Sequence, residues 1–202
     1  NEIVDTEFIW VADIMIAAGA KNFIFESQNN GFGIAATSKH IKEIIPDAYI
    51  IASFAVGAEG FTAEGCFAEE LVREMKECPY VDAIGFNCGS SASYLADVVK
   101  RLNGKGLLDG VTLIVMPNAG YPQVLGMRTF YEGDPYYFAK RTTELVTYGA
   151  RLIGGCCGTT PAHIYEIAKL LDKGDYGSFV QVKKAQDNKE EDEVGSRFWD
   201  NL

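Results

Sequence analysis

Ala83–Cys88 (AIGFNC) is a short apolar run that ends in one cysteine, and Ala150–Cys157 (ARLIGGCC) is a second run that ends in two. Nearly continuous apolar character is typical of strands that are buried on both faces of a parallel sheet. Three more segments share it, so the sequence predicts a sheet of five parallel strands. The additional strands are expected at Asn22–Ser27, Tyr49–Val56 and Thr112–Asn118.

Segments with helical periodicity alternate with these strands, which gives one helix followed by five βα pairs. The strands recur at roughly thirty residues, the length of one βα unit. Thr160 suits the N-cap of the last helix and Pro161 its first position, while Gly19 suits the end of the first helix. Helices are predicted over Glu2–Ala18, Gly33–Ile45, Phe67–Cys78, Ala92–Leu102, Pro135–Tyr148 and Pro161–Leu171.

This α/β pattern fits two architectures, an open doubly wound sheet and a (βα)8 barrel. Five units are too few for a barrel, so that interpretation requires three more units before Asn1. The loop Glu26–Gly31 lacks the glycine spacing of a phosphate-binding fingerprint, which disfavours a nucleotide-binding sheet. In both architectures the active site lies at the carboxyl ends of the strands, where the unusual residues gather. These loops are Glu26–Gly33, Asn87–Ser93, Pro117–Gly126 and Gly154–Thr160.

Composition narrows the class of protein further. The 202 residues carry a net charge of −10, which disfavours nucleic acid and anionic membranes as partners. Five cysteines without a signal peptide indicate a reducing, cytoplasmic setting. Lys183–Arg197 is polar and highly charged, as a solvated linker is. We therefore expect a folded part over residues 1–172 and a linker, or the start of a further module, over residues 173–202.

The cysteines at the strand ends predict a metal site. One strand separates the strand of Cys88 from that of Cys156 and Cys157, and alternate strands of a barrel contribute to the same interior layer. Three thiolates with the fourth position open suit catalytic zinc, since structural zinc sites fill all four positions. Simple core packing is the competing interpretation, and we apply it to Cys66 and Cys78. A vicinal disulfide would be strained.

Several of these segments match a known family. Gly85–Cys88 together with Gly154–Ile164 (GGCCGTTPAHI) resembles the homocysteine S-methyltransferase family. Phe25–Ser27 resembles the family's motif after the fourth barrel strand, and Pro117–Pro122 its motif after the seventh. The resemblance runs from about residue 1 to residue 171. It implies a (βα)8 barrel in which this chain supplies strands four to eight.

The resemblance also implies an activity. It predicts a methyltransferase that binds Zn²⁺ through Cys88, Cys156 and Cys157, and that methylates the thiol of homocysteine to give methionine. The methyl donor stays open among methyltetrahydrofolate, methylcobalamin, S-methylmethionine and betaine. The tail Ser196–Leu202 is loosely similar to the junction with a fused methylenetetrahydrofolate reductase module, and a cobalamin module is the other fusion that the family implies.

Polar residues near the strand ends are candidates for binding the substrate. The Glu26 carboxylate suits the amino group of an amino acid, a role that the resemblance supports. Asn118 offers both a donor and an acceptor with which to orient the substrate, or else simply forms a turn. Asn87 is expected to brace the loop before Cys88. Of the two histidines, His40 and His163, the second is assigned to a helix-turn surface or packing role rather than to zinc.

The sequence leaves two other functions open. An incomplete barrel without catalytic activity would hold zinc structurally or not at all. An open-sheet protein that binds another small thiol or a nucleotide would not require zinc.

Overall fold

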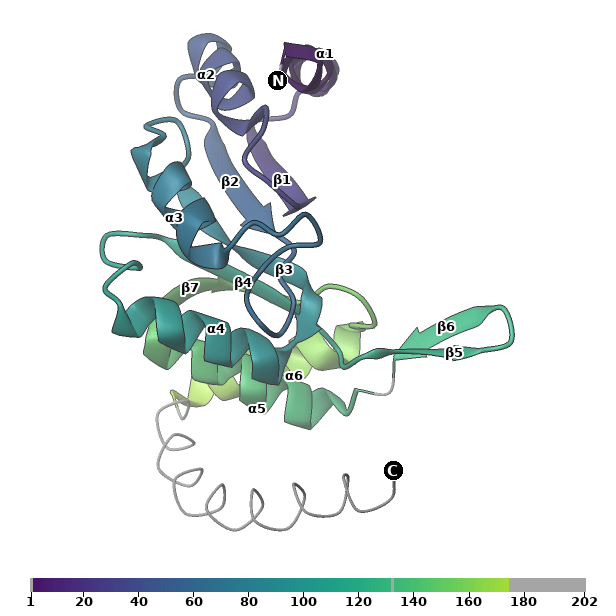
Figure 1. The fold of residues 1–202 in the computed structure, drawn as a ribbon. Coiled ribbons are helices and arrows are strands. Elements are labelled where there is room, and N and C mark those ends of the chain that lie inside the picture. The colour runs from purple at the N-terminus through teal and green to yellow at the C-terminus, as the bar shows by residue number, and fades with distance from the viewer. Residues whose placement is uncertain (1, 132, 175–202) are drawn as a thin grey trace.

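The computed structural model describes residues 2–131 and 133–174. Five parallel strands form one curved sheet, and their spatial order follows their order in the chain (Figure 1). A doubly wound sheet would reverse its strand order at a switch point, whereas a (βα)8 barrel does not. The order therefore favours the barrel. The strands are β1 (Asn22–Gln28), β2 (Tyr49–Phe54), β3 (Ala83–Ser91), β4 (Leu113–Asn118) and β7 (Ala150–Ile153).

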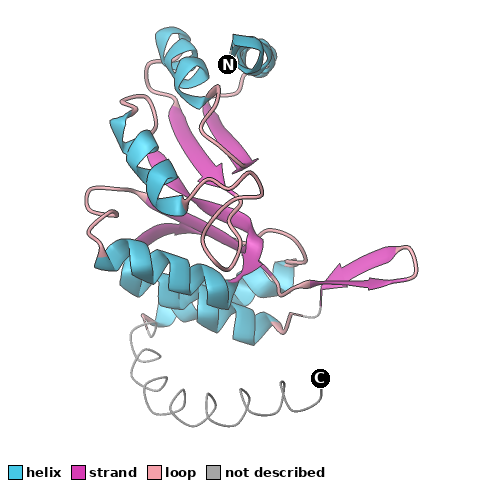
Figure 2. Ribbon diagram, viewed as in Figure 1, coloured by secondary structure: helices cyan, strands magenta, loops and turns pink. Residues whose placement is uncertain are grey.

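The helices line one side of this sheet, and the carboxyl ends of the strands open toward the right of the view in Figure 2. Each of the five strands of this sheet is preceded by a helix, as a chain of βα units requires. The predicted α/β class and helix order are confirmed. The helices are α1 (Glu2–Ala17), α2 (Ile34–Ile44), α3 (Ala68–Glu77), α4 (Ala92–Gly104), α5 (Pro135–Glu144), η1 (Leu145–Tyr148) and α6 (Pro161–Lys173).

Helix α3 shows why these segments fold as they do. Its buried residues Ala68, Leu71, Val72 and Met75 recur at three- and four-residue intervals, which places them on one face of a helix. The acidic and basic residues between them lie on the opposite face. The apolar face packs on the sheet in a core that also contains Phe54, Phe86 and Leu113.

Both predicted helix ends are confirmed. Thr160 and His163 form a capping box in which each side chain bonds the other's backbone, and Pro161 occupies the first turn of α6. Gly19 follows α1 with a φ of 93°, the left-handed conformation that glycine adopts without strain. The start of α6 is therefore fixed only a few residues after Cys157.

One part of the sequence interpretation was incomplete, because the segment Pro117–Gly126 is not simply a loop. It contains strand β5 (Pro122–Leu125), which pairs antiparallel with β6 (Arg128–Tyr131). Gly126 has a φ of 63° in the two-residue turn between them. Tight hairpin turns require such positive φ values and therefore favour glycine. The hairpin projects away from the sheet beside the carboxyl ends of the strands (Figure 1).

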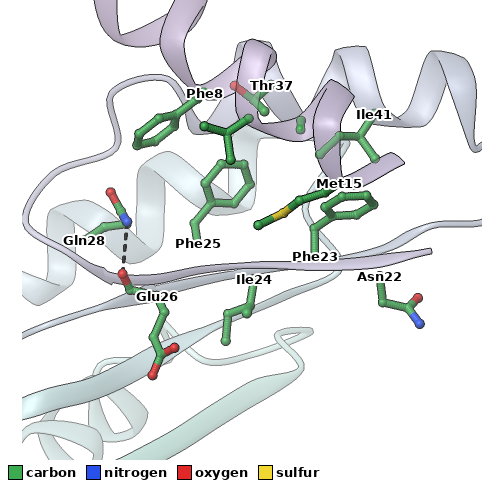
Figure 3. Close-up of a pocket in the computed structure, with 12 residues that line it drawn as sticks. Phe8, Met15, Asn22, Phe23, Ile24, Phe25, Glu26, Gln28, Thr37 and Ile41 are labelled. Carbon is green, nitrogen blue, oxygen red and sulfur yellow. Dashed lines mark hydrogen bonds between the residues drawn. The ribbon is translucent and has the colours of Figure 1, made fainter. Parts of the chain in front are cut away.

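A groove lies between α1, α2 and β1, which is an edge strand of the sheet (Figure 3). It has a volume of about 390 Å³ and is mainly apolar, with Phe8, Met15 and Phe25 among its lining residues. Phe23 and Phe25 point toward the two helices, while Ile24 and Glu26 point to the other side of the strand (Figure 3). The alternation of a strand thus directs Glu26 onto the helix-free face of the sheet.

None of the helices among residues 2–131 and 133–174 is long and apolar enough to span a membrane.

Candidate metal centre

Three cysteine sulfurs converge at the carboxyl ends of β3 and β7. The Sγ atoms of Cys88, Cys156 and Cys157 all lie within 4.8 Å of one another. Cys88 Sγ is 3.7 Å from Cys157 Sγ, and Cys156 Sγ is 4.0 Å from Cys157 Sγ. All three cysteines are free and half-buried. The structure thus brings together residues that are 69 positions apart in the sequence.

Cys88 reaches this position through an unusual backbone conformation. In a regular strand it would point to the helix side, because its neighbour Asn87 points to the opposite one. The φ of Cys88 is 58°, in the left-handed region that residues other than glycine rarely adopt. The pairing of β3 with β4 shifts register between Asn87 and Ser91, as it does at a β-bulge. This local turn directs the thiol toward the other two sulfurs.

Backbone hydrogen bonds to the end of β4 hold the loop that carries Cys156 and Cys157. Cys156 N donates to Pro117 O at 2.9 Å, and Ala119 N donates to Cys157 O at 2.9 Å. Asn118 Oδ1 accepts from Cys157 N at 3.1 Å. The vicinal thiols are therefore held by a neighbouring strand as well as by the capped start of α6.

The distances of Cys157 Sγ to the other two sulfurs fit a tetrahedral zinc site. Zn–S bonds of about 2.3 Å in tetrahedral geometry place two sulfurs about 3.8 Å apart. The observed separations of 3.7 and 4.0 Å are close to this value. A disulfide would instead require about 2.05 Å. These cysteines are also the one cluster of three or more potential ligands that we find in residues 2–131 and 133–174.

The thiols differ in their pKa values. Burial raises the pKa of Cys156 to about 11, and the charges of Cys88 and Cys157 add to the effect of burial despite a hydrogen bond from Asn87. Burial also acts to raise the pKa of Cys88. Hydrogen bonds from the Gly89 backbone and from neighbouring side chains, Cys157 first, outweigh that effect and place the pKa of Cys88 below its usual value.

The two predicted substrate-binding residues lie in different surroundings. Glu26 is exposed, and its Oε1 accepts a 3.4 Å hydrogen bond from Asn87 Nδ2, which also contacts Cys156 Sγ at 3.6 Å. Its carboxylate is therefore one side chain away from the thiols. Asn118 is 6% exposed, and its Oδ1 accepts a hydrogen bond from the backbone of the cysteine loop. Both remain candidates for binding the substrate.

The histidines take structural positions. His163 Nδ1 accepts from Thr160 N at 3.1 Å, so Nε2 carries the proton and donates to Gly133 O at 3.1 Å. His40 Nε2 lies 2.7 Å from Asp13 Oδ1 and joins α1 to α2. Neither belongs to the thiol cluster.

Tyr131 is a residue of the site that sequence reasoning missed. Burial and a hydrogen bond with Cys157 raise the pKa of its phenol, and the charges of the three cysteines act in the same direction. Tyr131 ends the hairpin strand β6 and packs against Gly158, where any Cβ would collide with its ring. The hairpin places Tyr131 next to Cys157. In the sequence, the glycine of the Gly126–Met127 turn was the residue that could have indicated this hairpin.

The fold and the cluster define an α/β protein of the (βα)-barrel type with three cysteines gathered at the carboxyl ends of its strands. The chain belongs to the homocysteine S-methyltransferase family, whose sequence profile matches residues 6–171. The family resemblance noted from the motifs is confirmed.

Two relatives show how this chain compares with longer proteins. It is 36% identical over 92 residues to methionine synthase of Mycobacterium tuberculosis, a match that covers 45% of this chain and 8% of that enzyme. It is 31% identical over 126 residues to homocysteine S-methyltransferase 4 of Zea mays, which covers 59% of this chain and 35% of that protein. The chain therefore matches only part of the length of these relatives.

Crystal structures of the homocysteine methyltransferase MmuM from Escherichia coli have a similar fold. The metallated form superposes with a TM-score of 0.62 at 25% identity, over 82% of this chain and 51% of that one. The oxidized form gives the same TM-score and identity and is covered to 52%. This likeness and the strand order together confirm the predicted (βα)8-barrel class, of which the described residues supply five βα units.

Proposed function

We propose that this chain takes part in the transfer of a methyl group to the thiol of homocysteine, giving methionine, with Zn²⁺ held by Cys88, Cys156 and Cys157. The convergence of these three sulfurs within 4.8 Å carries the proposal. Three protein ligands leave one position of a tetrahedral ion for the substrate, as in catalytic rather than structural zinc sites. Family membership supports the choice of substrate.

The chemistry that the metal supplies is Lewis acidity, which favours the thiolate form of a coordinated thiol at neutral pH. The thiolate matters because it, and not the thiol, is the nucleophile. Its sulfur attacks the methyl carbon of the donor, so an S–C bond forms while the bond between the methyl group and the donor breaks. The electron pair of the broken bond stays with the donor.

The residues around the cysteines would orient the amino acid. Glu26 presents a carboxylate on the helix-free face of the sheet, where a charge-assisted hydrogen bond to the ammonium group of homocysteine is available. Asn118 supports the backbone of Cys157 through its Oδ1 and also hydrogen-bonds the Cys88 side chain, which leaves one amide hydrogen for a neighbouring group. These two residues would thus fix the substrate at both sides of the cluster.

We also propose that further βα units pair with β1 to close the barrel. The edge of β1 carries the half-exposed Ile24 and borders an apolar groove, and the chain covers between 51% and 57% of the MmuM chains. Edge strands with exposed apolar residues are normally covered by another element.

X-ray absorption at the zinc edge tests the proposed function in the full-length protein. Without homocysteine we expect three sulfur ligands and one oxygen or nitrogen ligand, and with homocysteine we expect four sulfur ligands. A first shell that homocysteine leaves unchanged would contradict catalysis and would favour structural zinc. The variant Cys156→Ala should lose the metal, whereas Cys66→Ala, outside the cluster, should retain it.

A further inference from the structure

Asn87 is the most deeply buried polar residue beside the cysteines, and the reaction described above gives it no task. It lies on β3 with an exposed fraction of 0%. Its neighbour Phe86 points into the core between sheet and helices, so Asn87 points to the helix-free face, where the thiols and Glu26 also lie. Burying a carboxamide is unfavourable unless its donors and acceptors are satisfied.

The acceptor side of Asn87 is fixed by two donors. Its Oδ1 accepts from Ser27 N at 2.9 Å and from Ser53 Oγ at 2.7 Å. A backbone N–H can only donate, so the atom facing it must be the oxygen and the amide orientation follows. The carboxamide therefore joins β1, β2 and β3 just below the site.

The amide nitrogen of Asn87 faces the thiol of Cys156 and the carboxylate of Glu26. Nδ2 donates to Ser27 Oγ at 2.7 Å, which uses one of its two hydrogens. The other two contacts of Nδ2 are to Cys156 Sγ at 3.6 Å and to Glu26 Oε1 at 3.4 Å, and one hydrogen is left to serve both. One N–H is thus shared between a proposed metal ligand and the proposed substrate carboxylate.

Two strained backbone positions adjoin this side chain. Ser27 has a φ of 57° and Cys88 has a φ of 58°, and both are in the left-handed region although neither is glycine. Strand pairing shifts register at both places, between Phe25 and Gln28 on β1 and between Asn87 and Ser91 on β3. Strain of this kind persists only where surrounding contacts hold it. Asn87 bonds one of these residues directly and precedes the other.

We propose that Asn87 is a positioning residue, whose buried carboxamide holds Cys156 Sγ through an N–H···S hydrogen bond and ties this sulfur to the Glu26–Ser27 turn. The inference rests on the proposed function, because Cys156 is taken to bind the metal. Groups that hydrogen-bond metal ligands orient them, and their removal weakens metal binding or activity roughly 10- to 100-fold. The shared hydrogen links the position of the thiolate to that of the substrate carboxylate.

Cobalt substitution of the full-length protein gives the first test, because sulfur-to-cobalt charge-transfer bands report on the electrons of the thiolates. Asn87→Asp keeps the oxygen that accepts from Ser27 and Ser53 but has no N–H for Cys156. We expect these bands to move to lower energy, because a sulfur lone pair without its hydrogen bond is higher in energy. Retention of the metal against a chelator should fall roughly 10- to 100-fold.

Ser53→Ala is the matched control. It removes a buried hydrogen bond to the same carboxamide but leaves both N–H groups of Asn87 in place. A purely structural role predicts that Asn87→Asp and Ser53→Ala both lower the melting temperature and that neither moves the bands. That result would overturn the inference.

A second measurement needs no substitution. In the ¹¹³Cd-loaded wild-type protein, a scalar coupling should connect the side-chain amide proton of Asn87 with the metal through Cys156 Sγ. Absence of this coupling, with the ¹¹³Cd resonance in the range of sulfur ligation, would overturn the inference alone. A wild-type protein without any sulfur ligation of cobalt or cadmium would overturn the proposed function, and this inference with it.

Discussion

Cys88 Sγ lies 3.7 Å from Cys157 Sγ, although Cys88 belongs to β3 and Cys157 follows β7, 69 positions away in the chain. This distance matches two sulfurs that share one tetrahedral ion and is far longer than a disulfide. Replacing Cys157 by alanine leaves two of the three thiolates. We expect the metal content of the purified full-length protein to fall from about one zinc per chain to near zero.

The control for this variant is Cys78→Ala, which removes a buried cysteine at the end of α3 that lies outside the cluster. It should lower stability but leave the metal content unchanged. Mass spectrometry of the metals, with the protein concentration from amino-acid analysis, measures both variants. Full occupancy in Cys157→Ala would exclude the proposed ligand set.

Metal affinity should rise with pH. The pKa of Cys156 lies at about 11 without a bound cation, so this thiol carries its proton at neutral pH. A cation must displace the proton, because the thiolate is the ligand. We expect the affinity for Zn²⁺ to increase about tenfold per pH unit for each proton released. Calorimetry in buffers with different ionisation enthalpies should show at least one proton released near pH 7, and none would contradict this pKa.

The same pKa affects the stability of the metal-free protein. The folded-state pKa of Cys156 is raised from 9.0 to about 11, so the unfolded chain loses its proton first as the pH rises. The contribution of this thiol to stability is complete below pH 9 and declines as the pH rises to about 11. Urea unfolding across this range measures the decline. Cys156→Ala should have a flatter profile there.

Gly158→Ala should disturb the site through Tyr131. The φ of Gly158 is 78°, and a Cβ there would collide with the Tyr131 ring. Gly126→Ala is the matched control, since Gly126 has a φ of 63° and no atom within 4 Å of an added Cβ. Backbone strain alone costs about 1–2 kcal/mol, and the collision adds about 1–3 kcal/mol. Only Gly158→Ala should also weaken metal retention, whereas equal effects of the two would show that the hairpin contact is unimportant.

Glu26→Gln tests substrate binding apart from the metal. The amide keeps the shape of the carboxylate but cannot form the charge-assisted bond, which contributes about 1.5–3 kcal/mol. We expect the KM for homocysteine to rise roughly 10- to 100-fold at an unchanged zinc content. Glu43→Gln, at an exposed position on α2, should leave both unchanged. An unaltered KM in Glu26→Gln would assign the ammonium group to another residue.

Ile24→Asp tests whether the barrel closes on β1. Ile24 is 43% exposed in the described residues, on the face opposite α1 and α2. If further strands cover it, a buried carboxylate there should cost the full-length protein at least about 2 kcal/mol. Ile3→Asp on α1, at 71% exposure, should change stability by less than about 0.5 kcal/mol. Equally small effects at both positions in urea unfolding would contradict closure at this edge.

Much of the fold was predictable because buried strands and helices require characteristic patterns of apolar residues in the sequence. The continuous apolar runs marked every strand of the parallel sheet, and Thr160, Pro161 and Gly19 marked helix ends that the structure confirms. The exact strand ends were less predictable. β3 continues to Ser91 through its register shift, whereas β7 already ends at Ile153, before its glycines.

The three cysteines of the candidate site were predictable from the sequence, but the backbone conformation and the side-chain contacts around them were not. The glycine-framed cysteines indicated which residues would meet, because parallel strands bring their carboxyl ends to one edge. No periodic pattern marks the left-handed φ of Cys88 or the contact of Tyr131 with Cys157, since both depend on residues distant in sequence. The domain boundary expected near residue 172 falls at the end of α6, and residues 175–202 lie outside the described part of the chain.

The backbone conformation of Cys88 places its thiol in the cluster at the expense of protein stability. At a φ of 58° a glycine would sit without the strain that a thiol-bearing residue imposes, so Cys88→Gly should relax the turn even as it abolishes the sulfur. Selection for thermal stability alone would favour glycine over cysteine at this position, and the resulting protein would be more stable but would lack one of the three proposed metal ligands.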